Sequence, residues 1–160
     1  MTIPPKSVMS KEVVTVSPET TVVETAQRMV ARGVSAVPVV DAANRPLGVV
    51  SEGDVMRLFG AKFQNRRAQW LRMLAEGETL APEFLAAIGL DQCRVRDIMR
   101  TPVISAGEEA SLADLGDLMM KHGIKRVLIL RDGVLVDIVS RADVLGAVVG
   151  DLQGVLEMTD

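Results

Sequence analysis

The pattern of apolar and polar positions predicts a strand, a helix and two further strands in the first part of the chain. Residues 12–16 form a short extended run. Residues 17–33 keep apolar side chains at helical spacing and end at a glycine, which is typical of a helix end. The apolar runs 35–40 and 45–51, separated by turn residues, predict a hairpin. A second, short helix is expected to begin at Ser51.

The same order of elements recurs when the chain is shifted by 90 positions. Residues 8–40 then fall on residues 98–130 without a gap, and six positions are identical. One residue drops out in the following turn, after which residues 48–56 fall on residues 137–145. Because internal repetition marks a repeated structural unit, each copy is predicted to fold as β-α-β-β-α. The expected fold class is therefore α+β, with two repeats.

A helical insertion separates the two repeats. We assign residues 7–58 to the first repeat, 59–93 to the insertion, 94–149 to the second repeat and 150–160 to a C-terminal tail. Four side chains of the insertion recur at spacings of 4, 7 and 4 residues, which indicates one face of a helix packing on the module or on a second copy: Phe59, Phe63, Trp70 and Leu74. Its basic residues leave a nucleic-acid or membrane-surface contact open as the weaker interpretation: Lys62, Arg66, Arg67 and Arg72.

Composition restricts the class of protein further. Of 160 residues 48% are apolar and only four are aromatic, so the core is expected to be aliphatic. A net charge of −3 argues against a broad nucleic-acid-binding surface. The single cysteine, Cys93, excludes an internal disulfide and fits a reducing compartment. Without a signal-peptide core or a run near the ~20 apolar residues that span a bilayer, we expect a soluble cytoplasmic protein with no membrane contact.

The sequence offers little to catalysis or to metal binding. His122, the only histidine, falls in the last turn of a predicted helix, where a polar or cationic side chain suits the helix dipole. One histidine and one cysteine do not make a zinc site. Glycine-rich phosphate loops are absent, and the carboxylates are scattered rather than paired as an acid–base couple. We therefore predict no enzyme and no metal.

A repeated Ser-x-x-Asp is the strongest candidate for function. Ser51 and Asp54 in the first copy match Ser140 and Asp143 in the second, each pair at a predicted helix start. One interpretation is a capping box, in which the serine accepts from a free backbone N–H and the acid favours the helix N-terminus. The other is a ligand site, since free N–H groups attract anions and a carboxylate accepts two hydrogen bonds from a vicinal diol. The two interpretations are compatible.

The tandem pattern resembles a known family. The stretches VSAVPVVD, GVVSEGDVM and IKRVLILRDGVLVDIVSRADVL closely resemble a pair of CBS (cystathionine-β-synthase) domains, a Bateman module, over residues 7–58 and 94–149. The resemblance implies two small domains packed with pseudo-twofold symmetry around two clefts. It also implies adenosine-containing regulatory ligands (AMP, ADP, ATP, S-adenosylmethionine or NAD), a homodimer, and a sensor that acts on a partner protein.

The resemblance also assigns residues to the two clefts. In one cleft Asp54 matches the position that binds ribose, and Lys125 and Arg126 match a pair that faces nucleotide phosphates in the γ subunit of AMP-activated protein kinase. The full set for this cleft is Ser51, Asp54, Met99, Ile104, Lys125 and Arg126, of which Met99 and Ile104 match positions near the base. The other cleft would combine Ser140, Asp143, Met9, Val14, Ser35 and Ala36.

The two clefts are expected to differ in charge. Asp54 is grouped with two cations, whereas Ser35 and Ala36 give Asp143 none. Asp137 replaces the glycine found at position 48 of the first copy, and its carboxylate would repel a phosphate unless it faces solvent or pairs with Arg141. Leu128 also stands where the family pattern has proline. The Asp54 cleft is therefore predicted to prefer a phosphorylated nucleotide, and the Asp143 cleft a less charged adenosyl ligand or none.

Two alternatives to a ligand sensor remain open on the sequence. The module could serve only as a structural dimerisation unit with empty, vestigial clefts. It could also bind nucleic acid through the arginines of the insertion, although the charge balance disfavours this.

Overall fold

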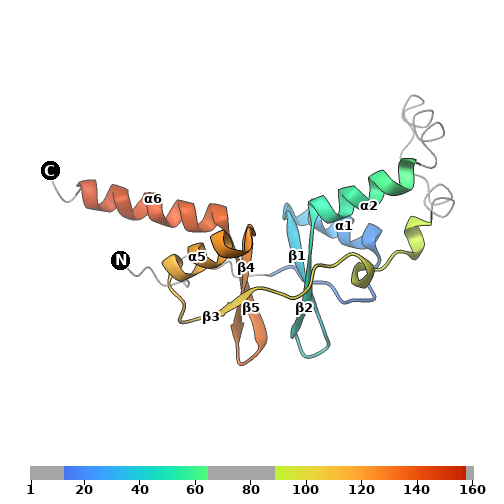
Figure 1. The fold of residues 1–160 in the computed structure, drawn as a ribbon, viewed down its shortest axis with the longest axis horizontal. Helices are drawn as coiled ribbons and strands as arrows, with labels where there is room; N and C mark the ends of the chain where they lie inside the picture. Colours follow the sequence, from blue (N-terminus) through green and yellow to red (C-terminus); the bar gives the residue numbers. More distant parts are fainter. Residues whose placement is uncertain (1–12, 65–88, 158–160) are drawn as a thin grey trace. The chain divides into compact units, whose positions relative to one another are not determined.

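The computed structural model describes residues 13–64 and 89–157, which belong to two compact units (Figure 1). The N-terminal unit comprises Val14–Pro102, and the C-terminal unit is described from Val103 onward. The stretch 94–102, which the sequence pattern assigns to the second repeat, belongs instead to the N-terminal unit.

The N-terminal unit is a hairpin with two helices along one side (Figure 1). Its elements are α1 (Val22–Arg32), β1 (Ala36–Val40), β2 (Pro46–Ser51) and α2 (Glu52–Gln64). The side chain of Thr21 caps the start of α1 by accepting from the Glu24 backbone N–H at 3.1 Å. Gly33 ends the helix with φ 64°, a left-handed conformation that glycine adopts without strain. Strands β1 and β2 pair antiparallel, and α2 follows Ser51 without a loop.

The segment after the undescribed part of the insertion returns to the N-terminal unit. It carries two short 3₁₀ turns, η2 (Leu90–Gln92) and η3 (Val95–Asp97). The Val22 N–H donates to the Cys93 carbonyl at 2.9 Å, and Val49 and Arg100 exchange backbone hydrogen bonds of 3.2 and 2.9 Å. Because Val95 is completely buried in the same core, this segment is part of the unit's packing.

The C-terminal unit repeats the arrangement with one more strand. Its elements are β3 (Ser105–Gly107), α5 (Leu112–His122), β4 (Arg126–Arg131), β5 (Val134–Ser140) and α6 (Arg141–Glu157). Strand β3 runs parallel to β4, and β4 pairs antiparallel with β5. Asp132 and Gly133 both have positive φ, as a two-residue hairpin turn between β4 and β5 requires. Helices α5 and α6 pack on this sheet.

The two cores confirm the repeat. Five positions of the core of the C-terminal unit coincide with core positions of the N-terminal unit at offsets of 90 or 89 residues. The pairs are Val22 and Leu112, Met29 and Met119, Val37 and Val127, Val39 and Ile129, and Val50 and Val139. The predicted α+β fold with two repeats is therefore confirmed, and the described core is aliphatic as expected.

Three details of the sequence prediction need correction. Of the extended run 12–16, Val16 alone pairs within the described residues, as an isolated parallel bridge to Val39. The helices after Ser51 and Ser140 are not short, since α2 reaches Gln64 and α6 reaches Glu157.

The helical face predicted for the insertion lies only partly within the described residues. Phe59 lies in α2 and packs against the core of the N-terminal unit. The side chains of the remaining members of that face, and the arginines of the insertion, lie outside the described residues. None of the described helices has the length and apolar character needed to cross a bilayer.

Candidate functional site

Ser51 and Asp54 cap the start of α2 reciprocally. The Ser51 backbone N–H donates to Asp54 Oδ2 at 2.9 Å, and the Ser51 hydroxyl donates to the same oxygen at 3.0 Å. The Asp54 backbone N–H points back at Ser51 Oγ over a longer distance of 3.4 Å. Strand β2 delivers Ser51 and helix α2 delivers Asp54, so the direct junction of strand and helix forms this pair. The capping interpretation is thus confirmed for the first copy.

Asp54 does more than cap the helix. Its side chain is only 6% exposed, and two guanidinium groups meet its second carboxylate oxygen, Oδ1. Arg57 Nη2 donates from the next turn of α2, and Arg100 Nε donates at 2.9 Å from the segment that pairs with Val49. The hydrogen bonds from both guanidinium groups to this buried carboxylate are charge-assisted, which makes them stronger than bonds between neutral groups.

These donors keep Asp54 ionised. Burial raises the pKa of its carboxyl group, because a low-dielectric environment penalises charge. Hydrogen bonds from the Ser51 backbone, from Arg100 and from the Ser51 hydroxyl, together with the charge of Arg100, act in the opposite direction. The balance places the pKa of Asp54 below its ordinary value.

In the second copy of the motif, Ser140 and Asp143 cap the start of α6, but the aspartate is not buried. The Ser140 N–H donates to Asp143 Oδ2 at 2.8 Å, and the Asp143 N–H donates to Ser140 Oγ at 3.1 Å. Asp143 is exposed, and no ion pair reaches it from the described part of the chain. The capping interpretation holds here as well. Within the described residues, arginines meet Asp54 but not Asp143, whereas the predicted contrast through Lys125 and Arg126 stays a prediction.

A third Ser-x-x-Asp shows that the cap alone does not identify a ligand site. Ser111 and Asp114 exchange the same two hydrogen bonds, at 3.0 and 3.1 Å, at the start of α5. Asp114 is exposed, and the Ser111 donors lower the pKa of its carboxyl group. Asp54 is therefore distinguished from Asp114 and Asp143 by its burial and its arginines.

The other candidates of the N-terminal unit lie around the junction of β2 and α2. Ala36 pairs with Ser51 in the hairpin, and the Ser35 carbonyl accepts from the Glu52 N–H at 2.9 Å. Met99 and Val14 pack against the core at half-buried positions. Met9 lies outside the described residues.

The candidates of the C-terminal unit occupy the equivalent places. Arg126 pairs with Ser140 in β4 and β5, and the Lys125 carbonyl accepts from the Arg141 N–H at 2.8 Å. The Ile104 carbonyl accepts from the Leu128 N–H at 3.1 Å. The grouping of Lys125 and Arg126 with Asp54 stays a prediction, as do the remaining ligand assignments.

Asp137 does not face solvent. Exposure to solvent was one of the two arrangements, besides pairing with Arg141, in which its carboxylate would not repel a phosphate. Its side chain is completely buried, and its Oδ1 accepts from the Ile138 N–H at 2.7 Å. The position of Gly48 in the first copy is thus occupied by a buried carboxylate in the second.

Sequence reasoning missed the two arginines that meet Asp54. Arg57 could have been found, since residues three apart face each other on a helix. Arg100 could not, because it lies 46 residues from Asp54 and reaches it only through the bridge to Val49.

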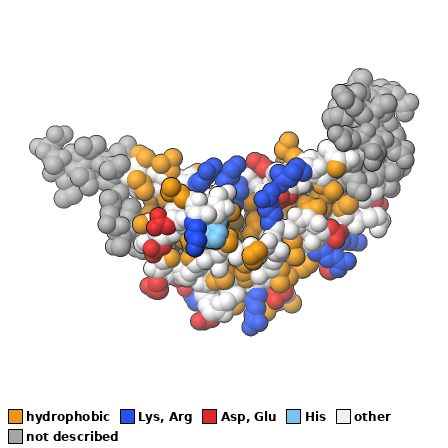
Figure 2. Space-filling model, in the orientation of Figure 1, with side chains coloured by type: hydrophobic (Ala, Val, Ile, Leu, Met, Phe, Trp, Pro, Cys, Tyr) orange, Lys and Arg blue, Asp and Glu red, His pale blue; other side chains and the backbone are white. Residues whose placement is uncertain are grey.

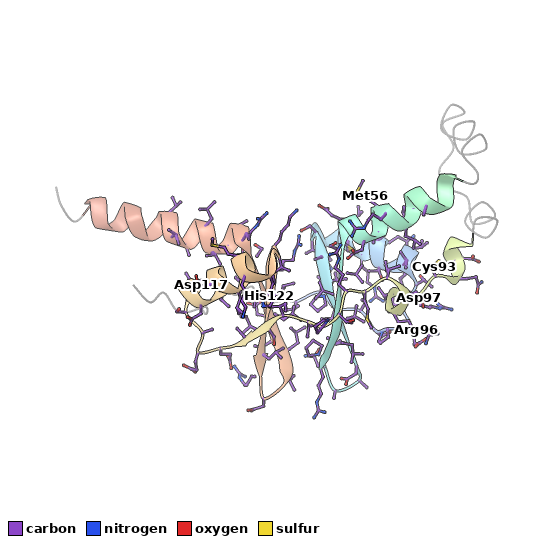
Figure 3. All side chains as sticks on the ribbon, viewed as in Figure 1. Met56, Cys93, Arg96, Asp97, Asp117 and His122 are labelled. Atoms are coloured by element: carbon purple, nitrogen blue, oxygen red, sulfur yellow. The ribbon has the colours of Figure 1, made fainter. Side chains whose placement is uncertain are left out.

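The histidine and the cysteine of the chain lie at a helix end and against a core. His122 ends α5 directly before Gly123, which has φ 61° (Figure 3). Cys93 packs on the core, and its thiol lies 3.5 Å from the Gly89 carbonyl. Within the described residues, His, Cys, Asp and Glu side chains form no group able to hold a metal ion.

Comparison with known families decides what this arrangement belongs to. The family model described as CBS domain matches the chain twice, at residues 6–61 and 95–150. The chain belongs to the CBS domain family. Its tandem pair of CBS domains carries the two Ser-x-x-Asp copies at the same point of each domain, between the last strand and the last helix.

Two curated relatives extend over most of this CBS pair. The CBS domain-containing protein YhcV of Bacillus subtilis is 30% identical over 138 residues, which cover 86% of this chain and 80% of the relative. An uncharacterised protein of Methanopyrus kandleri is 29% identical over 139 residues, again 86% of this chain. The match covers 59% of the Methanopyrus protein, so that relative is considerably longer than the CBS pair.

Solved CBS structures share the fold. The CBS domain of a membrane protein from Sphaerobacter thermophilus superposes with a TM-score of 0.71 at 29% identity, covering 91% of this chain and 87% of the other. CBSX2, solved with AMP, gives 0.67 at 21% and covers 92% and 96%. The CBS pair of protein MJ0100, solved with 5′-methylthioadenosine and S-adenosyl-L-methionine, gives 0.68 at 19% and covers 94% and 99%.

Proposed function

We propose that this CBS pair is a regulatory module that binds an adenosine-containing ligand, with Asp54 as the acceptor for the ribose diol. The observation that carries the proposal is the burial of Asp54, which a helix cap does not need, as the exposed Asp114 demonstrates. Two neighbours of the same fold were solved with AMP or with S-adenosyl-L-methionine, which supports this class of ligand.

The proposal favours a phosphorylated ligand at Asp54. Arg57 and Arg100 bring two positive charges to one carboxylate, so the cluster carries a net charge of +1 that suits AMP, ADP or ATP. Lys125 and Arg126 remain proposed phosphate contacts. Asp143 is exposed and lacks such cations among the described residues, which fits a less charged adenosyl ligand or an empty position.

Regulation would follow from a ligand-dependent change between two conformations. A ligand shifts such an equilibrium only by the difference in its affinity for the two states. Binding would then alter the surface presented to a partner protein, with no chemistry performed by the module itself.

Thermal unfolding with and without ligand tests the proposal. We expect AMP, ADP, ATP or S-adenosylmethionine to raise the midpoint, because a ligand that binds the folded state alone stabilises it by about 2.7 kcal/mol at a hundredfold excess over Kd. A midpoint that none of the four compounds moves, at millimolar concentration, would contradict ligand binding and favour the structural dimerisation module.

The exposed helix faces support a homodimer. Large apolar side chains reach solvent at repeat-equivalent positions, Val30 and Met120 at 84% exposure each, and Met56 and Leu145 at 71% and 65%. Met56 points away from the strands (Figure 3), and hydrophobic side chains interrupt the polar surface in several places (Figure 2). An outward apolar face retained in both repeats is typical of an association surface.

Carboxylates introduced at these exposed apolar positions should weaken the dimer. We expect the substitutions Met56→Glu and Leu145→Glu together to shift the protein toward monomer in light scattering coupled to size exclusion, since carboxylates would be buried at the interface. Leu47→Glu is the control, because Leu47 is also exposed (38%) but lies on the β2 hairpin. An unchanged mass for the double variant, or an equal loss with Leu47→Glu, would refute this surface.

A further inference from the structure

The carboxylate of Asp54 has no acceptor position left for a ligand. Two donors of Ser51 occupy Oδ2, and the guanidinium groups of Arg57 and Arg100 occupy Oδ1. Because a carboxylate accepts about four hydrogen bonds, a diol that donates two more has to displace two existing donors.

The arginines are the donors that can leave. The Ser51 N–H is held in the junction of strand and helix, whereas the side chains of Arg57 and Arg100 are 61% and 69% exposed. Exposed guanidinium groups regain water when they leave, and the diol hydroxyls take their places on the buried carboxylate, so the exchange leaves the carboxylate hydrogen-bonded. Each guanidinium also keeps unused N–H donors, and the planar fork of these donors matches a phosphate group.

Within the described residues, these two arginines meet Asp54, and the second copy of the motif does not retain them. At the repeat-equivalent positions, Arg57 is replaced by Gly146 and Arg100 by Ser10. The capping serine and the aspartate are retained in both copies. The arginines are therefore not part of the capping motif, and a role in the cap does not explain them.

We propose that Arg57 and Arg100 form an exchangeable lock on Asp54 that selects nucleotides over nucleosides, an inference that rests on the proposed ligand site at Asp54. The ribose diol replaces the arginines on Oδ1, and the released guanidinium groups pair with the ligand's phosphate. A nucleotide satisfies both halves of this exchange. A nucleoside can also hydrogen-bond to the carboxylate, but it has no phosphate with which the released arginines could pair.

The ratio of the affinities for AMP and adenosine tests the lock. We expect the wild-type protein to bind AMP at least about tenfold more tightly than adenosine, since the phosphate contacts are charge-assisted. In Arg100→Ala and in Arg57→Ala that ratio falls toward one, because AMP loses a phosphate contact while adenosine meets one competitor fewer. Adenosine alone should bind the variants as well as or better than the wild type.

Arg96→Ala is the matched control for these variants. Arg96, which Figure 3 labels, is an exposed arginine of the same unit (55%). It pairs with Glu19 at 2.7 Å rather than with Asp54. Its removal should leave the ratio at the wild-type value. Arg57 is an exposed helical position where alanine is well tolerated, so the test does not depend on Arg100→Ala remaining folded.

Three results would overturn the lock. A wild-type ratio retained in both variants means that the arginines do not contact phosphate. A parallel loss of AMP and adenosine means that they only support the fold. In these two cases the ligand site stands without the lock. Failure of AMP and adenosine to bind the wild type would overturn the lock, and the ligand site would fall with it if ADP, ATP and S-adenosylmethionine also fail to bind.

Discussion

Replacing Asp54 with asparagine is expected to lower the affinity for AMP by about tenfold or more. Hydrogen bonds to a charged acceptor contribute roughly 1.5–3 kcal/mol each, and 1.4 kcal/mol corresponds to a factor of ten. Asparagine keeps the size of the side chain and one acceptor oxygen for Ser51, but it removes the charge and replaces the second acceptor, proposed to receive the diol, with an amide NH2 donor. Isothermal titration with AMP measures the effect.

Asp114→Asn provides the control for lost capping. Asp114 exchanges the same two hydrogen bonds with Ser111, but no ligand role is proposed for it. Its replacement should reduce stability without changing the Kd for AMP. An equal loss of affinity in both variants would assign the effect to helix capping, and full affinity in Asp54→Asn would exclude a ribose contact.

Asp54→Asn should also change how the free energy of unfolding depends on pH. The pKa of Asp54 is lowered in the folded protein, relative to about 3.9 in an unfolded chain. The ionised carboxylate therefore contributes stability above that unfolded value, and this contribution is lost as the pH falls through the folded pKa. Urea unfolding from pH 7 to pH 3 should show the wild-type advantage over Asp54→Asn starting to shrink as the pH falls below about 4.

Local signals in the sequence account for most of the element boundaries. Gly33 and Gly123 end their helices in the left-handed conformation, and Asp132–Gly133 forms the tight turn of a hairpin, so glycine marked these points correctly. The core positions follow the repeat, because equivalent residues occupy equivalent places in two packed units.

The lengths of α2 and α6 were harder to predict. A helix propagates through residues of good propensity until a stop signal intervenes, and neither Gly60 nor Gly146 and Gly150 stops these helices. The expected ends rested on the limits of the repeat, which describe the similarity of two sequences rather than the energetics of a helix.

The environment of Asp54 depends on contacts that no local pattern contains. Asp54, Asp114 and Asp143 share one motif and one cap geometry, yet only Asp54 is buried. Its burial and its pairing with Arg100 arise from a segment that returns to β2 after a long insertion. Such a pairing is set by tertiary packing, so the sequence predicted the cap formed by Ser51 and Asp54 but not the arginines that meet Asp54.

Replacing Gly48 with aspartate is expected to lower the free energy of unfolding by about 3 kcal/mol or more. Aspartate is the residue that the second repeat carries at the equivalent position. Gly48 is buried in β2, and a Cβ atom there would lie 2.8 Å from Met99 Sδ and 3.0 Å from Met99 Cβ. Overpacking of this kind costs roughly 1–3 kcal/mol, and a buried carboxylate adds a desolvation penalty. Urea unfolding followed by circular dichroism measures the loss.

Two further variants separate the contact with Met99 from a general effect of glycine replacement. Gly60→Ala should stabilise the protein by up to about 1 kcal/mol, because Gly60 lies in α2 with nothing within 4 Å of the added methyl group. Gly48→Ala should be destabilising, and less so in a Met99→Ala background, since neighbouring residues couple in a double-mutant cycle. A Gly48→Asp protein as stable as the wild type would mean that Met99 moves aside freely. The backbone bridge between Val49 and Arg100 would then hold Arg100 beside Asp54 without close packing of Met99 on β2.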